Sequence, residues 1–131
     1  MTAQLLAKGM GASPGTATGE IVFRSEDAVS LAAKGTSVIL VRIETTSEDV
    51  PGMRAAAGIV TTRGGITGDA AIVARSLGKP CIASCPPIRV DYAKNCLTVW
   101  RDSTNDDDDD IVLQAGTVIT IDGGKGEIWS A

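Results

Sequence analysis

The sequence contains no histidine, and this absence excludes several kinds of chemistry. A Ser–His–Asp triad or a Cys–His pair cannot form within the chain. A zinc site that combines histidine with cysteine is excluded as well. Any general acid–base catalysis must therefore fall to carboxylates, lysines or the single tyrosine, Tyr92.

Aromatic residues, basic clusters and long apolar runs are also scarce. Aromatic residues make up 3% of the chain, so the core must be aliphatic and a stacking surface for single-stranded nucleic acid is not expected. The net charge is −4, and the lack of a basic patch disfavours nucleic acid as a partner. No apolar run approaches the roughly 20 residues needed to span a bilayer, and the N-terminus does not resemble a signal peptide. We therefore expect a cytoplasmic protein without membrane or nucleic-acid partners.

The chain has three cysteines, Cys81, Cys85 and Cys96. An odd number without a secretory signal predicts reduced thiols, with Cys81 and Cys85 in the core or near the surface. The acidic run Asp106–Asp110 is expected to be a solvated loop tip. A calcium loop is the alternative, but the run lacks the spaced ligands and the glycine of such a loop. No metal site and no cofactor are predicted.

The length of 131 residues predicts a single domain over residues 1–131. The middle of the chain alternates strands with short helices, and both ends are β. This order predicts an α/β fold with a small parallel core sheet, a flanking β layer and short helices. Residues 9–19 read as a loop or tight β-corner. Strands are predicted over residues 19–24, 37–43, 58–62, 80–83, 97–100, 111–113, 117–121 and 126–129, and helices over residues 25–33, 45–57 and 69–77.

The predicted helices carry their own signals. Thr46 or Ser47 is expected to cap the second helix, which has acidic residues in its first turn. In the third helix, Ile72, Val73 and Leu77 are expected to form the buried side.

A glycine-rich loop joins the third predicted strand to the third predicted helix. Gly64, Gly65 and Gly68 would let a ligand approach the backbone closely. The first turn of the helix offers unpaired N–H groups and a partial positive charge. Arg63 could add a charge-assisted contact to a phosphate, although bracing the loop is an equally open role. The loop is therefore a candidate anion site.

The same loop carries a family resemblance. Residues 63–75 read RGGITGDAAIVAR, and GKPC follows at residues 78–81. This stretch resembles the phosphohistidine loop of the phosphoenolpyruvate-utilising enzymes, whose pattern is Gly-Gly-x-Thr-Ser-His-Ala-Ala-x-x-Ala-Arg. Residues 11–23, 38–53, 55–63 and 117–129 resemble the same family in the same order, and they are most similar to its pyruvate phosphate dikinase branch.

The resemblance implies a swivelling β/β/α domain. In full-length dikinases this domain moves a phosphoryl group between a nucleotide-binding domain and a phosphoenolpyruvate/pyruvate barrel. The chain would hold only the swivelling part. Its expected partners are therefore protein chains that carry the nucleotide-binding or the phosphoenolpyruvate-binding domain.

The sequence departs from the family pattern at the position of the carrier histidine. Asp69 stands at the position of the carrier histidine, and Gly68 stands at the position of the serine before it. A carboxylate at a helix start is already anionic and repels an incoming phosphate. Asp69 is expected to cap the helix or be vestigial; the alternatives are an aspartyl phosphate, an acid–base role or a mimic of the charged carrier. Thr67 matches a threonine that some family members use as a regulatory phosphosite, or it simply bonds to the loop backbone.

Three functions are compatible with these residues. The first is a freestanding, degenerate domain that cannot carry phosphohistidine and serves as a docking or anion-binding module. The second is a subunit of a split phosphotransferase that acts through Asp69 or Thr67. The third is a small-ligand enzyme that reuses the glycine loop as an anion pocket. The sequence favours the first and leaves open whether the chain is an enzyme. Arg42 and Glu44 are expected to pair at a strand edge rather than form a site.

Overall fold

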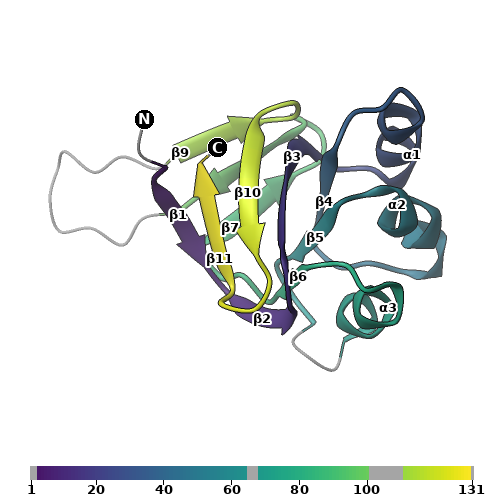
Figure 1. Cartoon of the computed structure of the whole chain (residues 1–131). Helices are drawn as coiled ribbons and strands as arrows, with labels where there is room; N and C mark the ends of the chain where they lie inside the picture. Colours follow the sequence, from purple (N-terminus) through teal and green to yellow (C-terminus); the bar gives the residue numbers. More distant parts are fainter. Residues whose placement is uncertain (1–2, 65–67, 101–110, 131) are drawn as a thin grey trace, which may run out of the picture.

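The computed structural model describes residues 3–64, 68–100 and 111–130 (Figure 1). Gly65, Thr67 and the acidic run Asp106–Asp110 lie outside the described residues. The elements are β1 (Leu5–Lys8), β2 (Met10–Ser13), β3 (Thr16–Val22), α1 (Ser25–Ala33), β4 (Val38–Arg42), η1 (Ser47–Asp49), α2 (Val50–Ala55), β5 (Gly58–Thr61), α3 (Asp69–Leu77), β6 (Cys81–Ala83), β7 (Ile88–Asp91), β8 (Cys96–Val99), β9 (Ile111–Gln114), β10 (Val118–Asp122) and β11 (Glu127–Ser130).

The described strands form two sheets. The larger sheet has eight strands in the order β1-β11-β10-β3-β4-β5-β6-β2, and the smaller sheet has three in the order β7-β8-β9. Strands β3, β4, β5 and β6 are parallel, and every other pairing is antiparallel. The expected mixed α/β fold is confirmed. The Asp122-Gly-Gly turn joins β10 to β11 as a hairpin, as the sequence predicts.

Helices and the small sheet cover opposite faces of the parallel strands (Figure 1). Strand β4 shows how coverage of both faces determines the residues of a strand. Ile39 and Val41 pack into a cluster shared with the small sheet, whereas Val38 and Leu40 pack against the helices. All four side chains are fully buried. Because both faces are covered, the strand is a continuous apolar run rather than an alternating one.

Strands β1, β2 and β7 were not expected. For residues 9–19 the loop alternative is wrong, whereas the β-corner alternative agrees with two strands that are separated only by Pro14 and Gly15. Residues 10–13 pair with β6, and residues 16–22 form β3. Small residues are needed here because backbones approach closely. A Cβ atom at Gly11 would lie 2.5 Å from the carbonyl oxygen of Gly123. Glycine in this stretch therefore marks close packing within the sheet instead of a turn.

The predicted buried side of α3 is also wrong. The residues that α3 buries are Ala70, Ala71 and Ala74, whereas Ile72 is 54% exposed. Val73 and Leu77 are only partly buried. Small side chains let the helix lie close to β6 and β2, and Ile72 is left on the surface.

The three cysteines are free and buried, and Cys81 and Cys85 belong to the core. Burial raises the pKa of each of these two thiols to about 12. For Cys81 the nearby Arg75 guanidinium opposes this effect only weakly.

These thiols predict a loss of stability at alkaline pH. An unfolded thiol ionises near pH 9, whereas the folded thiols keep their protons up to about pH 12. Between these values the unfolded state binds fewer protons, so the free energy of unfolding falls as pH rises. The expected loss is about 1.4 kcal/mol per thiol per pH unit above pH 9. Urea unfolding between pH 7 and 10.5 checks this, and the slope should be about half as steep in Cys85→Ala. An unchanged slope in a Cys81→Ala, Cys85→Ala double variant would contradict the assignment.

Candidate functional site

The candidate site lies where the parallel strands β4 and β5 end. Glu44 and Thr45 follow β4, and Arg63 and Gly64 follow β5. Asp69 begins α3, the helix that leads from β5 to β6. Ligands in α/β sheets bind outside the carboxyl ends of the parallel strands, and the predicted loop residues lie at that edge.

Backbone hydrogen bonds continue beyond the two strands and hold their connections side by side. The amide of Thr62 donates to the carbonyl of Arg42 at 3.2 Å, and the amide of Arg63 donates to the carbonyl of Ile43 at 3.1 Å. The Thr61 hydroxyl donates to the Arg63 carbonyl at 2.8 Å. The loop after β5 therefore starts from a fixed position beside the loop after β4.

The glycines at the two ends of the loop lie against each other. Gly64 has a φ of +108°, a backbone conformation that favours glycine. A Cβ atom at Gly68 would lie 2.5 Å from the carbonyl oxygen of Gly64. Any larger residue at position 68, including the serine of the family pattern, would push the two ends apart.

Gly68→Ala is expected to lower the free energy of unfolding by about 1–3 kcal/mol, because the new methyl group meets backbone atoms that cannot yield cheaply. Gly124→Ala is a matched control, since its Cβ would make only an ordinary 3.4 Å contact with the Asp122 carboxylate. Urea unfolding of both variants measures the difference. Equal stabilities would show that the loop ends are not closely packed.

Asp69 is the first residue inside α3 and is exposed. The N-cap is Gly68, with φ −73° and ψ 165°, so the expected capping role of Asp69 is wrong. Its carboxylate still lies in the first turn, where the helix dipole contributes about 0.3–1 kcal/mol. Substitutions at position 69 should therefore leave the fold intact.

Two neighbouring cavities meet at Thr45 and Asp69. Both cavities are open to solvent, and they share these two residues as lining. The smaller one has a volume of about 250 Å³ and is lined by Glu44, Thr45, Arg63, Gly64, Gly68, Asp69 and Ala70. The larger one has a volume of about 310 Å³ and is lined by Thr45, Thr46, Ser47, Val50, Asp69, Ile72 and Val73.

The charges of the smaller cavity do not favour an anion. Its charged lining consists of the Glu44 and Asp69 carboxylates and the Arg63 guanidinium. Arg63 already pairs with Glu44 at 3.8 Å, with side chains 70% and 58% exposed, so the pair is weak and open to exchange. The expected pairing of Arg42 with Glu44 is wrong, because Arg42 instead approaches Asp49 at 3.7 Å.

Arg42 anchors the segment that carries Glu44 and Thr45. Its guanidinium donates to the carbonyl of Phe23 at 2.7 Å and lies 4.6 Å above the centre of the Tyr92 ring. The Tyr92 hydroxyl accepts a hydrogen bond from the Ile43 amide at 2.8 Å. The backbone on one side of the cavities is therefore tied to β3, β4 and the turn after β7.

A capping box fixes the far end of this segment. The Thr46 amide donates to the Asp49 carboxylate at 2.9 Å, and the Thr46 hydroxyl accepts from the Glu48 amide at 3.3 Å. Thr46 therefore caps the second helical segment, and it is one of the two residues, Thr46 and Ser47, that the sequence predicted for this role. Asp49 is buried and serves both this box and Arg42. The Thr-x-x-Asp spacing was readable in the sequence.

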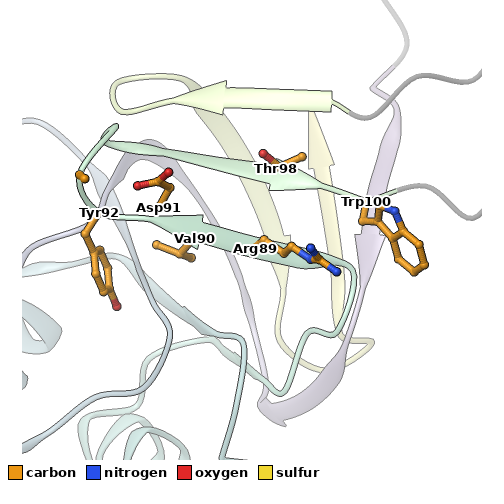
Figure 2. Close-up of a pocket in the computed structure, with 7 residues that line it drawn as sticks. Arg89, Val90, Asp91, Tyr92, Thr98 and Trp100 are labelled. Atoms are coloured by element: carbon orange, nitrogen blue, oxygen red, sulfur yellow. The ribbon is translucent and has the colours of Figure 1, made fainter.

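A separate hollow of about 630 Å³ lies on the small sheet (Figure 2). Figure 2 shows the Arg89 side chain extending toward Trp100, and the guanidinium lies 5.8 Å from the ring centre. None of the predicted site residues lines this hollow. Its charged lining is one arginine and one aspartate, Asp91, so it has no preference for either sign of charge.

Metal clusters and membrane-spanning helices are both absent from the described residues. Residues 3–64, 68–100 and 111–130 contain no group of three or more Cys, Asp or Glu placed to hold a metal ion. Within the same ranges, no helix has the length and apolar character needed to cross a membrane.

Residues 35–126 match the family model described as "PEP-utilising enzyme, mobile domain". The chain belongs to this family. This mobile domain is 48% identical over 124 residues to pyruvate, phosphate dikinase of Rhizobium meliloti. It is 46% identical over 125 residues to pyruvate, phosphate dikinase 2 of Zea mays. Each match covers 95% of the mobile domain but 13% of the relative, so the chain spans about an eighth of the length of these enzymes.

Among solved structures, the mobile domain is similar to the NMR solution structure of the Enzyme I (nEIt) protein. The two are 21% identical, with a TM-score of 0.43. The match covers 70% of the mobile domain and 29% of the other chain.

Proposed function

We propose that this mobile domain is a docking module that cannot carry phosphohistidine. It would bind protein chains that hold the nucleotide-binding or phosphoenolpyruvate-binding part of a dikinase. The observation that carries the proposal is the absence of histidine from a chain that is 48% identical to a dikinase over 95% of its own length. Asp69 takes the carrier position in this proposal and presents a carboxylate there.

The local charges support docking over anion binding. Asp69 and Glu44 outnumber Arg63 at the smaller cavity, and Arg63 is engaged by Glu44. An incoming phosphate would meet two carboxylates in a half-open site. We therefore favour docking over the expectation that Arg63, Gly64, Gly65 and Gly68 bind an anion.

We take the chain as one swivelling unit, and the sheet supports this. The first strand β1 and the last strand β11 pair with each other, and the Ser130 amide donates to the Gln4 carbonyl at 2.8 Å. The larger sheet thus contains both ends of the described chain, and the two core clusters share its strands. A unit closed in this way can move as a rigid body.

A subunit of a split phosphotransferase is the second candidate. The close approach of Gly64 and Gly68 and the 48% identity to a dikinase favour it. In that case an acyl phosphate on Asp69 or a phosphate on Thr67 would carry the function. The two candidates differ in whether the wild-type chain ever gains a phosphate.

Docking is tested with full-length Rhizobium meliloti dikinase in which the residue at the family's carrier position has been replaced, so that its own mobile domain cannot react. The wild-type chain should bind this enzyme in biolayer interferometry. Asp69→Lys should weaken binding at least tenfold, because it reverses the charge at the junction of the two cavities. Asp27→Asn, an exposed change on α1, should leave binding unchanged. No binding, or equal binding by all three chains, would refute the docking role.

A further inference from the structure

Thr45 lies at the junction of the two cavities with its hydroxyl unused. The residue is 7% exposed, and it lines both cavities. Across the described residues, no hydrogen bond of its side chain is found, although its neighbour Thr46 has a partner for its hydroxyl. Within the described residues, the Thr45 hydroxyl is not among the buried atoms that lack a partner, so it reaches the solvent of the open cavities. Thr45 therefore offers a hydrogen-bonding group to whatever enters the cavity.

The larger cavity has one charged end and one apolar wall. Among the described lining residues, Asp69 contributes the only charged group, a carboxylate. Val50, Ile72 and Val73 form the apolar wall, and Ile72 is 54% exposed although it is a large aliphatic residue. An occupant that satisfies both parts must be cationic at one end and aliphatic along its length.

We infer that this cavity receives an arginine side chain from the docking partner. The guanidinium donates hydrogen bonds to the Asp69 carboxylate and to the Thr45 hydroxyl. The aliphatic stem lies against Ile72 and its two valine neighbours. This inference rests on the proposed docking function and names the chemical group that the partner presents.

Arginine fits the cavity better than the alternatives. An anion would face the Asp69 carboxylate without a cation, because Arg63 is not in the described lining of the larger cavity and pairs with Glu44. Lysine carries a compact and strongly hydrated charge, whereas the guanidinium is planar, more weakly hydrated and has five donors. Arginine can thus reach a carboxylate and a hydroxyl at once, and it keeps its charge when an interface closes.

The probe is N-acetyl-arginine amide, with its uncharged analogue N-acetyl-citrulline amide as control. In ¹H–¹⁵N NMR spectra of the full chain, the arginine probe should shift the amide signals of Thr45, Asp69 and Ile72 in a saturable way. The citrulline probe should not. Equal shifts with both probes, or shifts that do not saturate around these residues, would overturn the inference.

Two variants separate a specific site from general charge attraction. Asp69→Asn should weaken arginine binding about tenfold or more, and Thr45→Val should weaken it about threefold while keeping the side-chain shape. Asp27→Asn should change nothing. Unaltered arginine affinity in Asp69→Asn or Thr45→Val contradicts the inference.

The outcomes also distinguish this inference from the docking role. The dikinase could bind as strongly to Thr45→Val as to wild type while the arginine probe causes no specific shift. This result would support the docking role and contradict the arginine site. If the arginine probe binds but the dikinase does not, the docking role falls instead.

Discussion

Asp69→His is expected to convert this chain into a phosphoryl carrier. In the proposed function, position 69 is the carrier position, and its side chain is exposed at the first turn of α3. A neutral imidazole nitrogen is a nucleophile that can take a phosphoryl group, and the helix N-terminus favours the negative charge that arrives with it. Gly68 is best kept, because its contact with Gly64 leaves no room for a side chain.

The gain is measured by intact-mass spectrometry after mixing the variant with phosphoenolpyruvate, magnesium and the dikinase whose own carrier residue has been replaced. Most of the Asp69→His chain should gain the mass of one phosphoryl group, and the gain should be lost in acid, as expected of phosphohistidine. Asp69→Asn should gain nothing. A folded Asp69→His variant that binds the dikinase yet stays unmodified would contradict the assignment of position 69 as the carrier position.

Arg42→Leu is expected to destabilise the fold by about 3–5 kcal/mol. The change leaves the buried Asp49 carboxylate without its cation and removes the donor to the Phe23 carbonyl. It also removes the cation from the Tyr92 ring, worth about 0.5–1 kcal/mol or more. These contacts position the segment that carries Glu44 and Thr45, so binding of the arginine probe should weaken as well.

Urea unfolding measures this loss, and Arg89→Leu is the matched control. Arg89 is exposed on the small sheet and lies over Trp100 only, so its loss should cost at most about 1 kcal/mol. The Arg42→Leu, Asp49→Asn double variant should be less destabilised than the two single changes added together, because the unpaired charge is gone. Additive losses, or equal losses for Arg42→Leu and Arg89→Leu, would show that Arg42 is not an anchor.

Much of the fold was predictable because several signals agreed with one another. The apolar run of β4 and the Asp122-Gly-Gly hairpin were recognised with nearly correct limits. The missed strands have other causes. Strand β2 is Met-Gly-Ala-Ser, whose small residues are typical of turns, and only its close contact with Gly123 explains them. Contacts between residues distant in sequence are not readable from local propensity.

The candidate site was predicted only in part. Arg63, Gly64, Gly68 and Asp69, which the sequence marked as candidates, line one cavity at the edge of the sheet. Thr45 was not predicted as a site residue. It lines the cavities together with Asp69, which begins α3 more than twenty residues further along the chain. The rule that ligands bind beyond the carboxyl ends of parallel strands could have pointed to it. Ile72 is exposed because the alanines of α3 form its buried side. The spacing of apolar residues in the sequence does not show which of them face the sheet.

The most direct test of the central claim is the intact mass of the wild-type chain after incubation with ATP, phosphoenolpyruvate, magnesium and the same dikinase. The docking proposal predicts an unmodified mass in a mixture that modifies Asp69→His. A phosphate that hydroxylamine removes would reveal an acyl phosphate on Asp69 and contradict the claim. A hydroxylamine-resistant phosphate on Thr67 would also contradict it and favour the split phosphotransferase.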